Sequence, residues 1–371
     1  MKIDLSKIDL TNFMIHDHFI GGELVTLVQP NHIGAKWTQE NKHFRSSVWS
    51  YDGTLISASF PKFVNWGENP QEFPVPQSLN KCTIVDKLDG SCLIVSKYKG
   101  NYILRTRGTV DASLMDNGHE LEIFRNTILP KLEIDIFNRN SNVSQDTWNV
   151  SYLFEWTTPE NKIVIRYSNV EFRLIGIVNH DHYTLWTQSS LDFLAKELDL
   201  LRPYTYTFTT VTDLLSSVEK WTGKEGVVVY SHHDQMLHKV KSANYLALHR
   251  MKSEFSNIEA VIDVWLEQDR PNYIDFYNYV SNVADFETAE EVKGFISNIC
   301  DANKEVNCII QGMSDFVNNK VKLLPTRKEQ ALLITSAYGI TNRAGYVFKI
   351  LDNKPIDKED IKKLLFQCLK R

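Results

Sequence analysis

The tetrapeptide Lys-Leu-Asp-Gly at residues 87–90 contains a lysine that could act as a nucleophile. It lies between apolar runs at residues 82–85 and 91–95, so Lys87 is expected where one β-strand ends and the next begins. An amine attacks an electrophile only while it is uncharged, and an ordinary lysine is almost wholly protonated at neutral pH. A single K-x-D-G sequence is a weak signal, because a lysine at a strand end is more often simply solvated. Its interpretation depends on charged residues elsewhere in the chain.

Those charged residues follow in an order that suits nucleotidyl transfer. In that chemistry an amine attacks the α-phosphorus of ATP in line and forms a phosphoramidate. Nearby cations and partial desolvation would depress the pKa of the attacking amine. The charged residues are Arg45, Lys62, Arg105, Arg107, Glu155, Glu225, Lys239 and Lys241.

Lys239 and Lys241 are two residues apart in a predicted strand, so their side chains are expected on the same face. Together they would supply a positive field and stabilise the charge that develops on the α-phosphate, as would Mg²⁺ or Mn²⁺. Alone, the two lysines are typical of the solvated face of an amphipathic strand, and this alternative stays open.

Two glutamates and two glycines complete the pattern. Glu155 and Glu225 are candidates for holding the metal through water and for binding the ribose hydroxyls. Gly90 and Gly226 lack a Cβ atom and would let the backbone come close to the nucleotide. Taken singly, either glutamate would be an ordinary residue of a turn or a strand edge.

The composition excludes several other classes of protein. The chain has 371 residues, of which 43% are hydrophobic and 23% charged, as in an ordinary soluble globular protein. A formal net charge of -5 argues against a generally polycationic nucleic-acid coat, although a local basic groove is compatible with it. The five cysteines include no C-x-x-C pair, so we expect a reducing compartment, the cytoplasm, or the host cytoplasm if the protein is viral. No apolar run is long enough to span a bilayer, and we expect no membrane association.

The predicted elements divide the chain into two domains. Strands and helices in the first two-thirds show no strict βαβ alternation, which favours a mixed, largely antiparallel α+β domain. From about residue 250 the apolar residues follow a helical period instead. We therefore expect an α+β domain at residues 1–248 and an all-α domain at residues 249–371. Strands are expected at residues 102–107, 152–155, 163–167, 172–178 and 226–230, and helices at about 111–130, 189–201, 328–337, 342–351 and along a final stripe from Ile361 to Leu369.

The order and spacing of the motifs resemble the covalent nucleotidyltransferase superfamily of ATP-dependent ligases and capping enzymes. Within it, the chain is similar to the single-strand RNA ligase family typified by the T-even bacteriophage enzyme. The family pattern is K-x-D-G-S, a basic residue with Gly-Ser/Thr, F-E-F, E-G-x-V and K-x-K-S. Its counterparts here are Lys87 to Ser91, Arg107-Gly108-Thr109, Phe154-Glu155-Trp156, Glu225 to Val228 and Lys239 to Ser242, and Phe60 to Asn65 resembles an upstream K-F-F-N. The chain differs from the type member at Val64, Leu88 and Arg107.

The resemblance implies an enzyme that seals 5′-phosphate and 3′-hydroxyl ends of single-stranded RNA. Lys87 would become adenylylated with release of pyrophosphate, AMP would pass to the RNA 5′-phosphate, and a 3′-hydroxyl would displace it. By analogy the RNA is a broken tRNA anticodon loop, which the helical domain would help select, and we expect a monomer. The implied roles are catalytic for Lys87, Lys239 and Lys241, nucleotide-binding for Arg45, Lys62, Asp89, Gly90, Arg107, Glu155, Glu225 and Gly226, and metal-binding for Glu155 and Glu225, with ATP and Mg²⁺ or Mn²⁺ as the cofactors.

Two other functions stay open on the sequence alone. A DNA ligase or mRNA guanylyltransferase of the same superfamily usually carries a small β-barrel after the final lysine motif, where helices are predicted here. A non-catalytic RNA-binding protein could instead keep a nucleotide pocket as a relic, which the complete set of charged residues disfavours.

Overall fold

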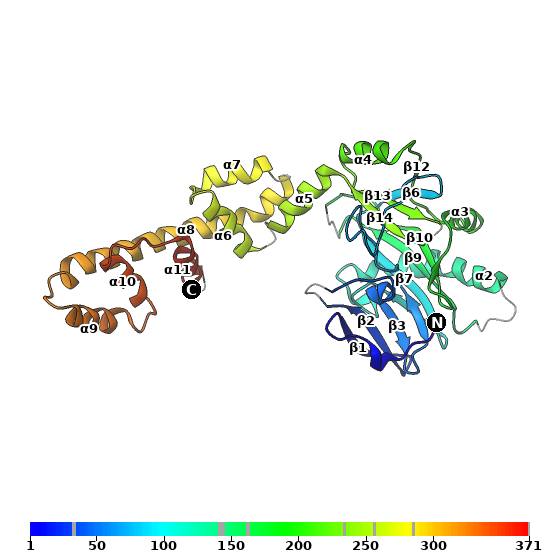
Figure 1. Cartoon of the computed structure of the whole chain (residues 1–371), viewed down its shortest axis with the longest axis horizontal. Coiled ribbons are helices and arrows are strands. Elements are labelled where there is room, and N and C mark those ends of the chain that lie inside the picture. Colours follow the sequence, from blue (N-terminus) through cyan, green and yellow to red (C-terminus); the bar gives the residue numbers. More distant parts are fainter. Residues whose placement is uncertain are drawn as a thin grey trace. The chain divides into compact units, whose positions relative to one another are not determined.

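The computed structural model describes residues 1–31, 35–139, 145–160, 164–232, 235–254, 257–283 and 286–369. Its contacts between Cα atoms fall into two compact units, residues 1–247 (unit 1) and 248–371 (unit 2). Figure 1 shows strands in unit 1 and helices in unit 2. The expectation of largely antiparallel sheets is confirmed, since β14 with β5 is the one parallel pair among the strands that the structure describes.

Unit 1 contains three sheets, built mainly from antiparallel pairs. In spatial order, the first consists of β1 (Phe13–Ile20), β2 (Glu23–Pro30), β3 (Ser47–Ser50) and β4 (Leu55–Ala58). The second consists of β11 (Thr184–Leu185), β10 (Glu171–Asn179), β9 (Val150–Thr157), β7 (Ser91–Tyr98) and β8 (Asn101–Arg105). The third consists of β12 (Thr205–Tyr206), β6 (Cys82–Lys87), β13 (Gly226–Ser231), β14 (Leu237–Lys241) and β5 (Val64–Asn65).

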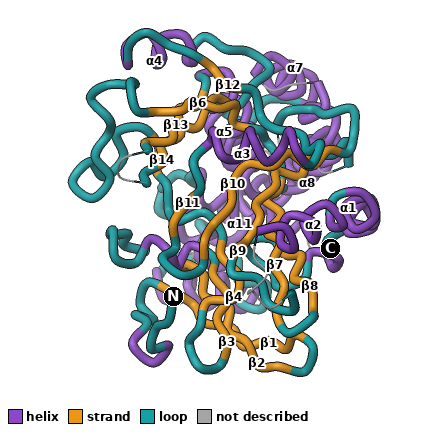
Figure 2. The backbone as a smooth tube through the Cα atoms, turned by 90° about the vertical axis from the view of Figure 1, so that its right-hand side faces the viewer, coloured by secondary structure: helices purple, strands orange, loops and turns teal. Residues whose placement is uncertain are grey.

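The second sheet is buried on both faces. On β7, Leu93 and Val95 face a core shared with helices α1 (Leu121–Thr127), α2 (Leu129–Arg139) and α3 (Gln188–Glu197). Ile94 lies between them in sequence and faces the opposite core, together with Val85 of β6 and Trp49 of β3. Alternate residues of a strand point to opposite faces, so burial on both sides gives the continuous apolar run seen in the sequence. Figure 2 shows β7, β9 and β10 between the strands of the first and third sheets.

The third sheet carries one further helix on its outer face. Helix α4 (Val211–Glu219) buries Leu214 and Val218 against Val227 and Val229 of β13. Its N-cap, Thr210, accepts a hydrogen bond from the backbone N–H of Asp213, which satisfies a free donor of the first helical turn. The inner face of the same sheet is therefore the one that can carry a site.

Unit 2 is helical in all its described regular elements. Helix α5 (Ala243–Glu254) follows β14 directly and crosses the unit boundary. One core joins α6, α7, α11 and most of α8, and a second, smaller core joins the end of α8 to α9 and α10. The helices are α6 (Ile258–Glu267), α7 (Tyr273–Val283), α8 (Phe286–Phe316), the π-helix η5 (Val317–Val321), α9 (Arg327–Tyr338), α10 (Ala344–Leu351) and α11 (Lys358–Leu369).

Two of the expected elements are wrong. Residues 164–167 form no strand, and residue 163 lies outside the described residues. The backbone N–H groups of Val164 and Ile165 donate hydrogen bonds to the side chain of Asp89 instead. The helix expected at about 111–130 is several short pieces, and α2 continues it to Arg139. The remaining strands and helices that were predicted are present within a few residues of the expected limits.

Candidate nucleotide-binding site

A cavity of about 360 Å³ lies on the inner face of the third sheet, against the second sheet. Lys87 is the last residue of β6, and Ser91 begins β7 in the other sheet, so the Lys-Leu-Asp-Gly segment crosses between the two sheets at this cavity. Five of the predicted site residues line it, namely Arg45, Lys87, Gly90, Arg107 and Glu155. The apolar lining includes Phe60, Phe63, Val85, Met115, Ile175 and Val228.

Strand register brings the three predicted catalytic lysines to one face. Lys87 is opposite Gly226, and Gly226 is opposite Lys241 on the next strand. Lys239 is two residues before Lys241, so its side chain emerges on the same face. The expected common face of Lys239 and Lys241 is therefore confirmed, and the structure adds Lys87 to it.

Glu225 joins two of these lysines. Its Oε2 atom lies 2.8 Å from Lys87 Nζ, and its Oε1 atom lies 2.9 Å from Lys241 Nζ. The Glu225 side chain is only 3% exposed, so both ion pairs are shielded from solvent on the carboxylate side.

Gly226 has to be glycine for steric reasons. Its φ of 148° is one that other residues rarely adopt, and a Cβ atom would lie 2.0 Å from the carbonyl oxygen of Val240. At Gly90 a Cβ would lie 2.4 Å from the carbonyl oxygen of Trp156. Both glycines therefore permit close strand packing around the cavity.

Lys239 is a buried lysine with a depressed pKa, which the sequence did not predict. Burial lowers its pKa to about 7, and Arg45, Lys87 and Lys241 add to the effect through charge repulsion. Its Nζ atom lies 5.1 Å from the centre of the Phe63 ring. A bound polyanion would reverse this effect by favouring the ammonium form.

Glu155 lies opposite Cys92 of β7 and faces the cavity. Burial raises the pKa of its carboxyl group to about 7, an effect that the charge of Lys87 opposes. Its Oε1 atom accepts a hydrogen bond of 3.0 Å from the backbone N–H of Gly90. Glu155 therefore fixes the turn that follows Lys87.

The remaining predicted cations extend the site into a second cavity of about 560 Å³. Arg45 and Arg107 line both cavities, whereas Lys62 lines the second, with its Nζ atom 5.3 Å from the centre of the Trp37 ring. Burial lowers the pKa of Arg45 to about 10, and the neighbouring Arg107 lowers it further. This arrangement suits a chain of phosphates that starts at Lys87 and extends past both arginines.

Asp89 does not line either cavity. Its Oδ2 atom accepts hydrogen bonds of 2.7 and 2.8 Å from the backbone N–H groups of Val164 and Ile165. Its Oδ1 atom accepts one of 2.7 Å from the hydroxyl of Tyr245, whose pKa is raised chiefly by burial. The structure thus places Asp89 as an anchor between the Lys87 turn, the segment after residue 163 and the start of α5.

Arg105 has a structural role that the sequence did not predict. It is fully buried, and its guanidinium donates hydrogen bonds to the side-chain and backbone oxygens of Ser46 and Ser57. The Ser46 hydroxyl in turn donates to the backbone oxygen of Arg107. Arg105 therefore connects the segments that carry Arg45 and Arg107. Its place in an apolar strand was the only signal in the sequence.

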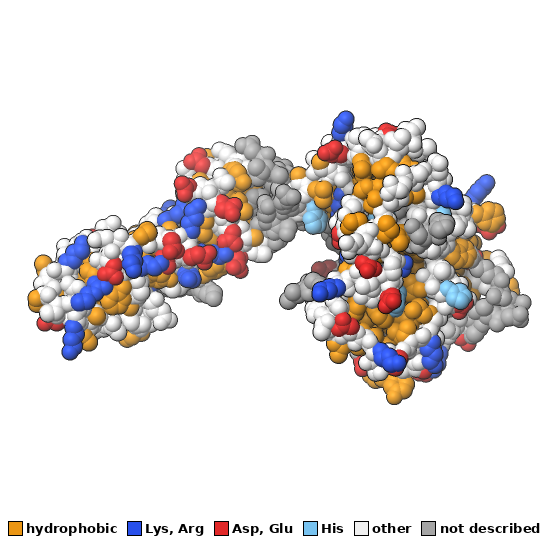
Figure 3. All heavy atoms as spheres, viewed as in Figure 1, with side chains coloured by type: hydrophobic (Ala, Val, Ile, Leu, Met, Phe, Trp, Pro, Cys, Tyr) orange, Lys and Arg blue, Asp and Glu red, His pale blue; other side chains and the backbone are white. Residues whose placement is uncertain are grey.

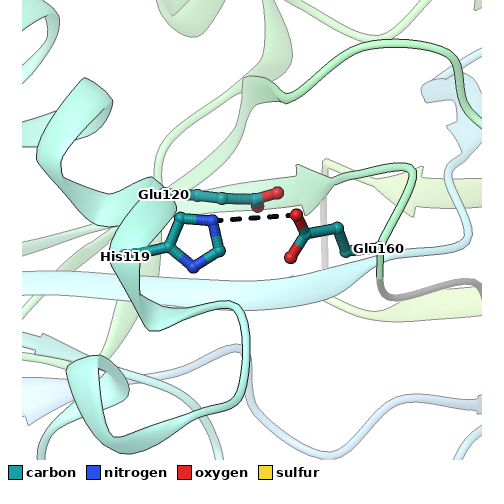
Figure 4. Close-up of side chains that lie close together, drawn as sticks. All are labelled: His119, Glu120 and Glu160. Atoms are coloured by element: carbon teal, nitrogen blue, oxygen red, sulfur yellow. Dashed lines mark ion pairs between the residues drawn. The ribbon is translucent and has the colours of Figure 1, made fainter.

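A separate group of metal-type ligands lies away from these cavities. Figure 4 shows His119 and Glu160 pointing toward each other, with Glu120 beside them. The three candidate ligand atoms lie within 4.8 Å of one another. Glu120 accepts hydrogen bonds from Trp156 Nε1 and the hydroxyl of Thr158, one at each carboxylate oxygen. This buried carboxylate therefore already has a structural task, which is to hold the turn at 118–120 against β9.

Comparison with known proteins gives one relative in sequence. The chain is 23% identical over 315 residues to a candidate bifunctional polynucleotide kinase/RNA ligase of the Autographa californica nuclear polyhedrosis virus. The match covers 76% of this chain and 42% of that protein, so the chain spans less than half the length of this relative. The resemblance to RNA ligases is confirmed. No protein-family model matches the chain.

Solved RNA ligases also show a distant likeness. An archaeal ATP-dependent RNA ligase is 13% identical with a TM-score of 0.42, over 77% of this chain and 72% of that chain. A Naegleria gruberi RNA ligase with ATP and Mn is 18% identical with a TM-score of 0.36, over 47% of this chain and 52% of that chain. Both TM-scores are too low for residue roles to be transferred.

Proposed function

We propose that the chain is an ATP-dependent RNA ligase that seals 5′-phosphate and 3′-hydroxyl RNA ends through a lysyl-AMP and an RNA-adenylate. The main support is the arrangement around Lys87, which lines the cavity together with Glu155 and forms an ion pair with Glu225. Lys239 and Lys241 emerge on the same face of the sheet as Lys87. That arrangement provides a nucleophile and a positive field for developing phosphate charge. The sequence relative is described as a kinase/RNA ligase, which supports the same class of reaction.

In the first step the Lys87 amine would attack the α-phosphorus of ATP. A P–N bond forms, the bond from the α-phosphorus to the bridging oxygen breaks, and pyrophosphate leaves. The amine gives up one proton to solvent in the same step. Lys239 and Lys241 would offset the negative charge on the α-phosphate, while Arg45, Lys62 and Arg107 bind the leaving phosphates.

Glu155 and Glu225 fit a hard divalent cation, because both present buried carboxylate oxygens beside Lys87. Mg²⁺ or Mn²⁺ held there would neutralise phosphate charge. Drawing Glu225 away from Lys87 would also release the amine for attack. Gly90 and Gly226 would allow the nucleotide to approach the backbone.

The later steps complete the joining reaction. The oxygen of an RNA 5′-phosphate attacks the α-phosphorus of lysyl-AMP and returns the amine of Lys87. An RNA 3′-hydroxyl then attacks the adenylylated 5′-phosphorus, forms the phosphodiester and expels AMP. We assign residues 1–248 to adenylyl transfer and residues 249–371 to RNA selection, with a tRNA anticodon loop as the expected substrate of a monomeric enzyme in the cytoplasm or the host cytoplasm. No helix in the described part of the chain is long and apolar enough to cross a membrane.

The related DNA ligase and capping functions are less well supported. Helix α5 follows β14 directly, and no strand follows it among the described residues, so the β-barrel typical of those enzymes is not seen there. A GTP-specific label would nevertheless favour the capping reaction.

Covalent labelling tests the nucleophile. Incubation with α-labelled ATP and Mg²⁺ should label the wild-type chain, and Lys87→Ala should remove the label because the amine that would form the phosphoramidate is gone. Lys81→Ala, at an exposed lysine just before the same strand, should label normally. Labelling that persists in Lys87→Ala would refute the assigned nucleophile.

RNA joining tests the rest of the reaction. The labelled enzyme should circularise a 5′-phosphorylated oligoribonucleotide, and labelled GTP should leave no label. Joining of nicked DNA but not of RNA would favour the DNA ligase. RNA binding without any covalent label would favour a non-catalytic RNA-binding protein that keeps the nucleotide pocket as a relic.

A further inference from the structure

Charge is segregated along unit 2. Residues 257–315 contain three Lys or Arg and twelve Asp or Glu, a net charge of -9. Residues 316–354, which we call the basic end, contain seven Lys or Arg and two Asp or Glu, a net charge of +5. In Figure 3 the acidic side chains of unit 2 gather toward α6 and α8 rather than over the end that carries α9 and α10.

The basic end is one small body. Val317, Val321, Ile334 and Val347 form its buried core, which joins η5, α9 and α10 and packs against Met313 of α8. Helix α9 begins with a capping box, in which Thr326 and Glu329 satisfy each other's backbone N–H groups. Cations on these elements are therefore held on a common scaffold.

Most cations of the basic end are not neutralised within the described part of the chain. Arg327 pairs with Asp352, and Lys349 pairs with Asp357 and Asp360. No ion pair with a described residue involves Lys320, Lys322, Lys328, Arg343 or Lys354. By contrast, Lys304 of α8 pairs with Asp301, and Lys362 of α11 pairs with Glu259 and Asp263.

Apolar side chains are exposed among these cations. Leu323 is 76% exposed, Leu332 is 64% exposed and Ile340 is 97% exposed. Such side chains can contact the riboses and bases of an unpaired strand, while lysines offset its phosphates.

We propose that the basic end of unit 2 binds the phosphate backbone of single-stranded RNA. This deepens the proposed function and rests on it, since the same chain would act on RNA ends. The acidic stretch at residues 257–315 repels a polyanion, so RNA held by unit 2 should lie at the basic end. Release of counterions from the phosphates drives such binding and makes it sensitive to salt.

The test compares two triple variants of the full chain. Lys320→Glu/Lys322→Glu/Lys328→Glu reverses three unpaired charges of the basic end. Lys7→Glu/Lys196→Glu/Lys304→Glu makes the same change in net charge at exposed lysines elsewhere. Binding of a fluorescent 5′-phosphorylated oligoribonucleotide is measured from 50 to 200 mM salt, and labelling by α-labelled ATP is measured in parallel.

The basic-end variant should bind RNA about tenfold or more weakly, with a salt slope lower by about 2, as expected for three lost phosphate contacts. The control variant should change RNA binding much less, and both variants should label with ATP like wild type. If the glutamate variant melts at a lower temperature than wild type, the corresponding triple glutamine variant replaces it.

Other outcomes separate the two proposals. Normal ATP labelling with unchanged RNA affinity and salt slope would overturn the RNA surface and leave the ligase intact. Failure of wild type to label would overturn the ligase, while the RNA measurements would still decide the binding surface. Weakened binding of the basic-end variant to anionic phospholipid vesicles, with RNA binding unchanged, would assign the surface to membranes and overturn the proposal.

Discussion

At the scale of single residues, the site is governed by buried charges whose protonation depends on the ligand. Lys239 has a pKa of about 7 because it is buried, and neighbouring cations add to the effect. At pH 8 it is therefore mostly neutral. Phosphates placed beside it favour the ammonium form and raise its pKa again, so nucleotide binding should take up a proton above pH 7.

Calorimetry can measure this proton. A wild-type chain titrated at pH 8 with an ATP analogue that has carbon between the α- and β-phosphorus atoms should take up close to one proton more than Lys239→Met. The difference is obtained by repeating the titration in buffers of different ionisation enthalpy. Lys81→Met serves as the control and should behave like wild type. Equal uptake by Lys239→Met would show that another group titrates.

The lowered pKa of Lys239 also makes the free energy of unfolding depend on pH. Lys239 has a lower pKa in the folded chain than in the unfolded chain, so the unfolded chain binds more protons between about pH 7 and the ordinary lysine pKa. Its contribution to the free energy of unfolding should therefore rise with pH across that window. Below about pH 7 the group is charged in both states and the full cost of burying it remains.

The sequence could predict that Lys239 and Lys241 share a face of their strand, but not which carboxylate pairs with the lysines of the site. Lys239 and Lys241 share a face because the side chains of a strand alternate. The pairing of Glu225 with Lys87 joins residues 138 positions apart, so it depends on the order of strands in the third sheet. That order is a property of the fold and leaves no local pattern.

At the scale of elements, Arg105 connects two sheets through hydrogen bonds alone. Its guanidinium reaches Ser46 and Ser57 of the first sheet region from β8 of the second, and no carboxylate among the described residues forms an ion pair with it. Sequence reasoning grouped Arg105 with Arg107 as a basic pair. It could not distinguish them, because burial between sheets is decided by packing that involves residues far apart in the chain.

Replacing Arg105 with methionine should destabilise the fold by about 2 to 4 kcal/mol, because buried serine and backbone oxygens lose their donors. It should also raise KM for ATP in the labelling reaction, since Arg45 and Arg107 lose their common support. Urea unfolding and the KM measurement check both effects. Lys2→Met removes an exposed ion pair with Asp52 and should cost less than about 1 kcal/mol. A similarly small loss of unfolding free energy in Arg105→Met would contradict the structural role of Arg105.

The segment after residue 163 shows why one predicted strand is wrong. Its β-branched residues are typical of a strand. The backbone N–H groups of Val164 and Ile165, however, donate to Asp89 instead of to a neighbouring strand. The side chain of Asp89, which lies in a turn far away in the sequence, thus takes the place of the neighbouring strand that the pattern implied.

Asp89→Asn tests this anchor. The amide nitrogen of asparagine cannot accept hydrogen bonds, so at least one of the bonds to Val164, Ile165 or Tyr245 should be lost. We expect a loss of about 1 to 3 kcal/mol in stability and slower labelling of Lys87 at saturating ATP. Asp111→Asn, in an exposed turn of a neighbouring region, should leave the labelling rate unchanged. A change in KM without a change in rate would instead indicate that Asp89 contacts the nucleotide.

At the scale of the whole molecule, the two units contribute different properties. Unit 1 combines the cavity and its cations, whereas unit 2 carries the charge segregation that the total of -5 conceals. Composition predicted an ordinary acidic protein and allowed a local basic groove. It could not show where unneutralised basic residues gather. Some cations, such as Lys304, are neutralised by an ion pair, here with Asp301, and only the structure shows which ones.

The carboxylate of Glu225 lies 2.8 Å from Lys87 Nζ, the nitrogen that the proposed reaction uses. Aldehydes, acyl phosphates and other stray electrophiles of the cell would have to displace this carboxylate to reach that nitrogen. In the proposed reaction, the side chain that must move for the triphosphate to react would therefore also protect Lys87 from accidental modification.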